Sequence, residues 1–144
     1  MKLNGLHHLN IRCSASDLAP IESFYTEVIG LQRGYRPDFK NEGIWLYDGG
    51  HPLVHVSMRC PEGFLAGDKH NGSVDHIAFR AAGAGDFIAR LERLGLSYQQ
   101  QNVPEAGYQV FLRDPVGTLL EFNFPNEEAP GSVASGTLAD RNAV

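Results

Sequence analysis

The sequence predicts an α+β fold of two βαβββ modules that form a cupped mixed sheet. The first observation behind this prediction is an internal repeat, which marks a duplicated structural unit. LYDGGHPLVHVSM at 46–58 aligns without a gap with LRDPVGTLLEFNF at 112–124. In both copies an Asp is followed by a turn rich in Gly and Pro and then by an alternating strand. The second half of each module therefore repeats in the second half of the chain.

The opening strands repeat in the same way, which is the second observation. LHHLNIRC at 6–13 aligns with VDHIAFRA at 74–81. The alignment pairs two histidines and two arginines, His8 with His76 and Arg12 with Arg80. Equivalent positions of the two modules should therefore carry the same chemistry.

Each module has a helical pattern after its opening strand. Asp17 can cap a helix that runs to about Ile29, with Pro20 in its first turn and Gly30 as its stop. Its apolar stripe consists of Ile21, Phe24, Tyr25 and Val28. The second helix is expected over 86–94, with Phe87, Ile88, Leu91 and Leu94 at helical spacing. Extended segments should complete the modules at 31–36, 44–47, 97–103 and 108–113.

The domain boundaries follow from these elements. One domain should cover 1–125, with modules at about 4–58 and 73–125 joined by the loop 59–72. Residues 126–144 are rich in Ala, Gly and Ser and lack periodicity, so we expect a flexible tail. Each module alone would be marginally stable, whereas two modules can bury a shared core.

Composition excludes several function classes. The chain has 144 residues, 42% of them apolar, and a net charge of −5. No basic stripe suggests nucleic acid, and no apolar run of about 18 residues suggests a membrane span. The N-terminal residues lack the apolar run of a signal peptide, so we expect a cytoplasmic protein. Cys13 and Cys60 are too few for a disulfide framework and form no zinc knuckle.

Strand alternation places four potential metal ligands on one polar face. Successive side chains of a strand point to opposite faces, so His8 and His76 oppose the apolar residues that pack under the helices. His55 and Glu121 hold the same relation to their apolar neighbours in the closing strands. Imidazole and carboxylate together suit Zn, Ni, Co, Mn or Fe(II). The remaining histidines, His7, His51 and His70, receive an ordinary surface or core interpretation.

The same faces offer candidates for substrate binding. Arg12 and Arg80 can hold an anionic group, because a guanidinium binds carboxylates in a fork. Pairing with nearby acidic residues explains them equally well. Asn10 and Asn123 share the polar face, and Trp45, Tyr47, Tyr108 and Phe111 could form aromatic pocket walls or ordinary core. We expect a small-molecule substrate that is anionic or aromatic.

The chain resembles the vicinal oxygen chelate superfamily, which includes glyoxalase I, epimerases, extradiol dioxygenases and antibiotic-resistance proteins. The matching segments are GLHHLNI, SFYTEVIGL, SVDHIAF and FLRDPVGTLLEF. The resemblance implies that His8, His76 and Glu121 are metal ligands and that His55 fills the variable fourth position. It also implies homodimers and a substrate chelated through adjacent oxygens.

The resemblance leaves several reaction types open. A lyase or isomerase of glyoxalase or epimerase type would use all four ligands, with Glu121 as the base. An extradiol dioxygenase would bind Fe(II) through His8, His76 and Glu121 and leave His55 as an acid/base, but its expected catalytic Tyr is Phe111 here. An antibiotic-resistance transferase or binding protein is a further alternative. We prefer the lyase or isomerase, although the sequence lacks the Lys-Gly-Gly type loop that glyoxalase I uses near glutathione.

Overall fold

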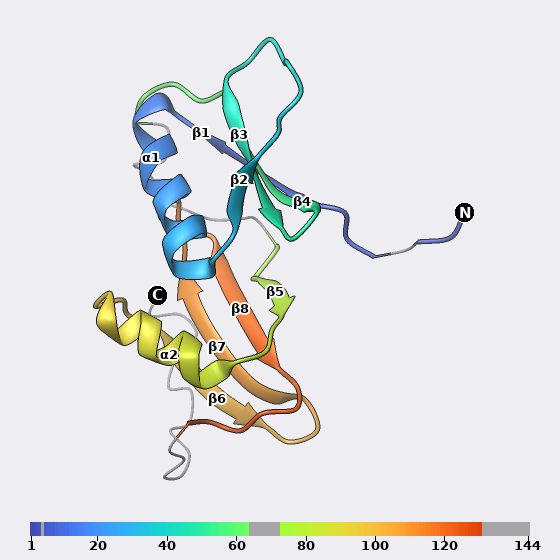
Figure 1. The fold of residues 1–144 in the computed structure, drawn as a ribbon, viewed down its shortest axis with the longest axis vertical. Coiled ribbons are helices and arrows are strands. Elements are labelled where there is room, and N and C mark those ends of the chain that lie inside the picture. Colours follow the sequence, from blue (N-terminus) through green and yellow to red (C-terminus); the bar gives the residue numbers. More distant parts are fainter. Residues whose placement is uncertain (4, 64–72, 131–144) are drawn as a thin grey trace. The chain divides into compact units, whose positions relative to one another are not determined.

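The computed structural model describes residues 1–3, 5–63 and 73–130 (Figure 1). The chain divides into two units, Met1–His70 and Asn71–Val144, each with its own four-stranded mixed sheet. His70, most of the predicted linker and the tail beyond residue 130 lie outside the described residues. The predicted α+β architecture of two βαβββ modules is confirmed, with one sheet in each module.

The first unit follows the predicted element order. Its elements are β1 (Leu9–Cys13), α1 (Ala15–Ser23), η1 (Phe24–Ile29), β2 (Gln32–Gly34), β3 (Gly43–Asp48) and β4 (His51–Met58). The sheet order is β1-β4-β3-β2, with β1 parallel to β4 and the other neighbours antiparallel. The helical segment, with β2 and β3 after it, forms the long crossover connection that a parallel pair requires.

The second unit repeats this topology. Its elements are β5 (Ile77–Arg80), α2 (Ala84–Arg93), β6 (Gln99–Val103), β7 (Gly107–Arg113) and β8 (Leu119–Phe124). The sheet order is β5-β8-β7-β6, and β5 again runs parallel to β8. The opening strands are shorter than predicted, so His8 and His76 each lie immediately before a strand.

The first helix begins earlier than predicted. Ser14, not Asp17, is the N-cap, and its backbone N–H donates to the Asp17 carboxylate at 3.1 Å. Asp17 therefore acts from the third helical position, as in a capping box. Pro20 consequently lies inside the helix rather than in its first turn. The helix continues as the π-helical segment η1 and ends at Gly30, whose φ of 95° favours glycine.

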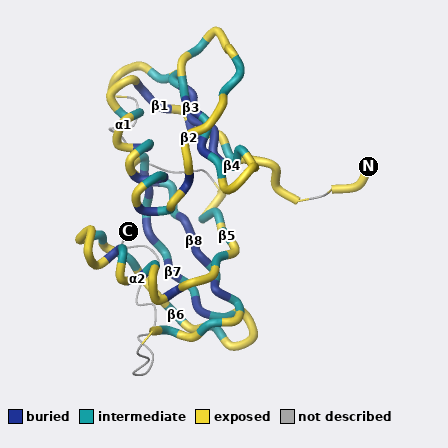
Figure 2. Tube along the Cα trace, in the orientation of Figure 1, coloured by how far each residue is buried: buried dark blue, intermediate teal, exposed yellow. Residues whose placement is uncertain are grey.

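Each helix covers one face of its own sheet. The predicted stripe of Ile21, Phe24, Tyr25 and Val28 is buried, together with Val54 and Val56 of β4 (Figure 2). In the second unit Phe87 contacts Phe122 of β8, with ring centroids 4.8 Å apart.

The second helix also differs at its ends from the prediction. It starts at Ala84, and the Glu127 carboxylate accepts the backbone N–H groups of Gly83 and Ala84. Leu94 follows the last helical residue and is 40% exposed, so it does not belong to the core stripe. None of the helices in the described parts of the chain is long and apolar enough to cross a membrane.

Candidate metal and substrate site

His55 lies on β4 between two aromatic rings in the first unit. Its face of the strand is opposite to that of the buried Val54 and Val56, yet only 9% of the residue is exposed. Trp45, its partner across β3 and β4, stacks on it with centroids 3.9 Å apart and planes at 6°. His8 stacks with centroids 3.9 Å apart and planes at 17°. Stacking thus fixes the orientation of the His55 ring.

The surroundings of His55 favour its neutral form. Burial lowers the pKa of His55 below its ordinary value, and the nearby His8 lowers it further. A hydrogen bond with the Pro52 backbone opposes this change. Nε2 is buried and has no hydrogen-bond partner among the described residues. A neutral imidazole with an unsatisfied ring nitrogen has the chemistry of a metal ligand, so His55 fits its predicted role.

His8 belongs to a group of histidines at the start of β1. Its Nδ1 lies 2.9 Å from Nδ1 of His7. His51 forms a hydrogen bond with the His7 carbonyl oxygen, and the two rings meet edge to face with centroids 5.1 Å apart. The first unit therefore brings the predicted ligands His8 and His55 together, with His7 against His8 and His51 against His7.

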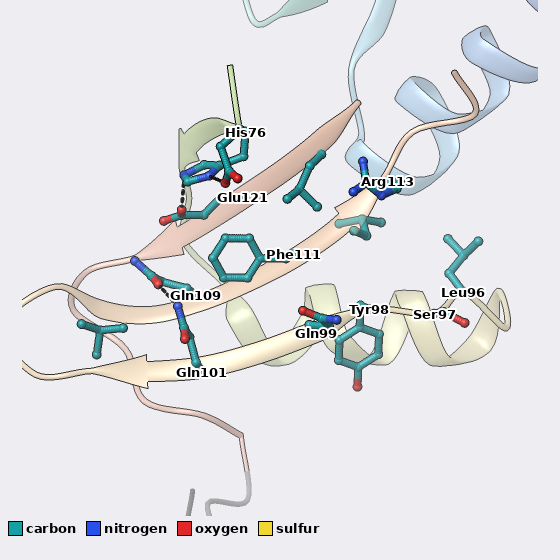
Figure 3. A pocket seen from close by; sticks show the side chains of 14 residues that line it. His76, Leu96, Ser97, Tyr98, Gln99, Gln101, Gln109, Phe111, Arg113 and Glu121 are labelled. Carbon is teal, nitrogen blue, oxygen red and sulfur yellow. Dashed lines mark hydrogen bonds and ion pairs between the residues drawn. The ribbon is translucent and has the colours of Figure 1, made fainter. Parts of the chain in front are cut away.

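The second unit brings its two predicted ligands together more directly (Figure 3). His76 Nε2 lies 2.9 Å from Glu121 Oε2, and His76 Nδ1 lies 2.7 Å from Asp75 Oδ1. The Glu121 side chain is 8% exposed. A carboxylate on one nitrogen fixes the tautomer and orientation of an imidazole, which turns the other nitrogen toward its ligand. Asp75 has this position, and sequence reasoning missed it.

Glu121 is also positioned by the neighbouring strand residues. Asn123 Nδ2 donates to Glu121 Oε1 at 3.3 Å. Phe111 pairs with Glu121 across β7 and β8, and its ring meets His76 edge to face with centroids 5.8 Å apart. The carboxylate thus lies between an amide donor and an apolar ring, so two of the three predicted substrate residues of this unit, Asn123 and Phe111, contact the predicted ligand pair.

A pocket of about 780 Å³ opens next to this pair. Asp75, His76, Phe111 and Glu121 line it together with residues of β6 and β7 and the segment before β6. The further lining residues with polar groups include Tyr98, Gln99, Gln101, Gln109 and Arg113 (Figure 3). Gln101 Nε2 donates to Gln109 Oε1 at 2.7 Å.

Strand register explains why these amides converge. Gln99 pairs with Phe111, which pairs with Glu121, and all three side chains share one face. Gln101 pairs with Gln109, which pairs with Asn123 in the next row. Strand alternation from 99 to 113 is the signal that could have identified these amides, because they share the parity of Phe111.

Four other sequence candidates, Asn10, Arg12, Arg80 and Tyr108, are not among the residues that line this pocket. Arg80 lines a separate hollow of about 370 Å³ beside Glu127, and not the larger pocket. Asn10 accepts a hydrogen bond from Ser57 Oγ at 2.8 Å, and Arg12 lies exposed on β1. Tyr108 points to the opposite face from Phe111 and is fully buried in the core, so it forms no pocket wall.

The predicted ligand set is thus represented by one pair in each unit. His8 and His55 meet in the first unit, and His76 and Glu121 meet in the second. Within either unit, the described residues contain no group of three or more His, Cys, Asp or Glu that could hold a metal ion. A site made by all four residues stays a prediction.

Comparison with known proteins places this arrangement in a family. A sequence profile described as Glyoxalase/Bleomycin resistance protein/Dioxygenase superfamily matches residues 5–122. The chain belongs to this superfamily. The match confirms the resemblance drawn from the sequence, and the superfamily contains both lyases and dioxygenases.

Individual relatives within the superfamily agree with this assignment. The chain is 30% identical over 125 residues to Glyoxylase I 4 of Arabidopsis thaliana, covering 84% of this chain and 71% of that protein. The structure of a lactoylglutathione lyase from Agrobacterium tumefaciens has a TM-score of 0.59 at 18% identity, covering 86% of this chain and 96% of the other. A fosfomycin resistance protein from Listeria monocytogenes, solved with Mn(II), has a TM-score of 0.63 at 16% identity, with coverages of 85% and 93%. These two structures share the fold.

Proposed function

We propose that the protein is a metal-dependent lyase or isomerase of the glyoxalase or epimerase type. The observation that carries the proposal is the triad Asp75–His76–Glu121, in which a buried carboxylate faces an imidazole whose other nitrogen is held by a second carboxylate. This is the usual arrangement of a metal-ligating histidine with its supporting acid. It opens directly on a pocket of substrate size.

The donor set fits a divalent ion such as Zn, Ni, Co, Mn or Fe(II). His8, His55, His76 and Glu121 would hold it, and the unsatisfied, buried Nε2 of His55 supports this assignment. The Mn(II) bound to the Listeria protein belongs to that protein, but it agrees with this chemistry. A bound ion would supply Lewis acidity that makes a C–H next to a carbonyl easier to deprotonate.

Glu121 is the proposed base. Its carboxylate is largely shielded from water and lies at the edge of the pocket, where it can accept a proton from a substrate carbon and return it. Asn123 donates to one of its oxygens and His76 lies against the other, so the direction of the carboxylate is fixed. His55 is the second residue that we expect to be essential, as a ligand in this reaction type.

The pocket indicates the class of substrate. Three neutral amides, Gln99, Gln101 and Gln109, line the pocket together with the ring of Phe111. They can bind uncharged oxygens while the ring contacts an apolar or aromatic body. Arg113 adds a cationic side chain to the pocket lining, and its Nη1 donates a hydrogen bond to the Gly117 carbonyl oxygen. We propose a small oxygenated substrate with an apolar body, bound through Phe111 and these amides.

An extradiol-type Fe(II) dioxygenase is the alternative, favoured by the aromatic surroundings of the ligands. Trp45 stacks on His55 and Phe111 contacts His76, and such walls suit a catechol ring. In this reaction His55 would act as an acid/base rather than as a ligand. Phe111 lacks the hydroxyl that this chemistry would use at that position. An antibiotic-resistance transferase or binding protein is a further candidate.

Anaerobic reconstitution separately with Fe(II), Mn, Ni, Co and Zn separates these functions. The lyase or isomerase predicts metal-dependent exchange of a C–H proton for deuterium on a 2-oxo substrate panel, followed by NMR, without oxygen uptake. Oxygen consumption with a catechol panel, without proton exchange, would contradict the lyase or isomerase and support the dioxygenase.

Metal content of two variants gives an independent test. His76→Ala should lose the ion in either case, because it removes a proposed ligand that both reaction types require. His55→Ala should weaken metal binding in a lyase, whereas in a dioxygenase it should keep the ion and stop turnover. His51→Ala is the matched control, since His51 is an exposed histidine on the same strand. A His76→Ala protein with full metal content would contradict both functions.

Cytoplasmic location and homodimerisation are further parts of the proposal, and they rest on the sequence and the family resemblance. Light scattering coupled to size exclusion measures the oligomeric state directly.

A further inference from the structure

The two cysteines of the chain, far apart in sequence, lie beside each other in the first unit. Cys13 is the last residue of β1, and Cys60 follows the end of β4 by two residues. The backbone N–H groups of Arg59 and Cys60 both donate to the Cys13 carbonyl oxygen at 3.1 Å. Because β1 and β4 pair in parallel with Cys13 opposite Met58, the residues that follow β4 lie next to Cys13.

The segment that carries Cys60 is also held on its other side. Glu62 accepts the backbone N–H of Ser16 at 3.3 Å and the Ser16 hydroxyl. These hydrogen bonds lower the pKa of Glu62, as expected for a carboxylate at the first turn of a helix. Hydrogen bonds on both sides of Cys60 therefore keep it against the turn between β1 and α1.

The two thiols differ in access to solvent. Cys13 is fully buried, whereas Cys60 is partly exposed, and both are free thiols. Burial, with Asp17 and the nearby Cys60 in support, raises the pKa of Cys13 to about 11. A reagent in solution should therefore react first with the Cys60 thiol. Cys13 should react only afterwards, with the modified Cys60.

We propose that Cys13 and Cys60 form a redox-modification site, at which a small disulfide oxidises them to an intramolecular disulfide. The Cys60 thiolate attacks one sulfur of a reagent such as glutathione disulfide and releases one thiol. Cys13 then attacks the Cys60 sulfur of the mixed disulfide and releases the second thiol. The two cysteine sulfurs lose their protons and are oxidised, and the reagent is reduced to two thiols.

The bond would have a measurable effect on stability. It would tie the end of β1 to the segment after β4 and close a loop that contains most of the first unit. Such a cross-link restricts the unfolded chain, and its effect grows with loop length. We expect the apparent Tm of the oxidised protein to exceed that of the reduced protein by about 5 °C.

Intact-mass measurement of the full chain tests the proposal. The protein is incubated with glutathione disulfide and alkylated with iodoacetamide under denaturing conditions. We expect loss of two hydrogens, no alkylation, and a cross-linked peptide pair containing Cys13 and Cys60. Two alkylated thiols, or a lasting glutathione adduct at Cys60 with Cys13 still free, would overturn it.

Cys60→Ser is the matched control because it removes the more accessible thiol and leaves the buried core intact. Its Tm should be the same before and after oxidation, whereas that of the unaltered chain should rise and fall back on reduction with dithiothreitol. An equal rise in the variant would show that the stabilisation does not come from this disulfide.

Discussion

The two units have the same strand pairing but carry different side chains at equivalent positions. In the first unit Trp45 is opposite His55, and its ring lies flat on the imidazole at 3.9 Å. In the second unit Phe111 is opposite Glu121, and its ring stands at 89° to His76 with centroids 5.8 Å apart. The first arrangement covers the predicted ligand His55 with aromatic rings, whereas the second leaves a pocket of about 780 Å³ beside the predicted ligands His76 and Glu121.

The outer strands β2 and β6 also differ at the position opposite this aromatic residue. Gly34 pairs with Trp45, and a Cβ at Gly34 would lie 2.5 Å from the Tyr47 ring, so this ring occupies the space over the glycine. Gln99 has the corresponding position opposite Phe111, and its side chain lines the pocket. The two units thus share the backbone topology and the positions of the predicted ligands, while a few side chains decide whether a face is filled or open.

The largest expected effect is a loss of kcat on substitution of Glu121, on the open face of the second unit. Glu121→Gln keeps the size of the side chain but removes the charge and the base. We expect kcat to fall by about 10²- to 10⁴-fold, the range for loss of a general base, with weaker metal binding. Steady-state kinetics and metal analysis of the variant measure both effects.

Trp45→Phe is the comparison in the filled unit. It keeps an aromatic ring on His55 and should change kcat by less than about tenfold, because it removes no group that we place in the chemistry. Equal losses in the two variants would mean that the filled and open faces do not have separate roles.

The residue before each predicted ligand histidine, His8 and His76, gives the next test. Asp75 contacts His76 Nδ1, and His7 contacts His8 Nδ1 in the equivalent position. Asp75→Asn should weaken metal affinity by about tenfold, the lower end for an outer carboxylate, because Asp75 is exposed. Competition with a chromophoric chelator measures the change. His7→Asn should have a smaller effect, and the reverse order would contradict the supporting role of Asp75.

A smaller effect concerns the filled face itself. Gly34→Ala should destabilise the first unit by about 1–3 kcal/mol, since the Tyr47 ring must move and Tyr47 is held by a hydrogen bond to the Tyr35 carbonyl. Urea unfolding gives the difference. Gly85→Ala in α2 meets no atom within 4 Å and should be neutral or slightly stabilising. If Gly34→Ala were as stable as the wild-type protein, the Tyr47 ring would not be fixed over this position.

The repeat explains which features the sequence could predict. Gapless alignment and strand alternation were sufficient for the topology, and they placed His55 and Glu121 on the faces opposite the core. The ends of the helices were predicted less well. Ser14 and Asp17 are both good capping residues, and only the hydrogen bond from the Ser14 backbone shows which one is the cap.

Pocket residues were harder to predict because they lie on parts of the repeat that have diverged. The alignment drew attention to Arg12 and Arg80, which match between modules, whereas Gln99 corresponds to a glycine. Asp75 was missed because its role depends on the orientation of the neighbouring imidazole. Matching positions of the repeats therefore predicted the architecture and the candidate ligands, whereas the pocket lining lies at positions where the repeats differ.

The smallest expected effect concerns the inner faces of the two sheets. That of the first unit is aliphatic at Ile44, Leu46 and Val54, whereas that of the second contains the fully buried Tyr108. Tyr108 donates a hydrogen bond to Gln100, and burial raises its pKa to about 12. An unfolded tyrosine ionises near pH 10, so the unfolded state loses this proton first as the pH rises. The contribution of Tyr108 to stability should be complete below about pH 10 and be lost between about pH 10 and 12.

Tyr108→Phe separates this contribution from the rest of the alkaline response. At pH 8 the variant should be less stable by about 1 kcal/mol, because it lacks the hydrogen bond to Gln100. At pH 11 the difference should shrink or reverse, since ionisation now favours the unfolded wild-type chain and leaves the variant unaffected. Urea unfolding at the two pH values measures the difference. If it stayed constant, the phenol would not be the group that titrates in the core, and the inner faces of the two units would respond alike to pH.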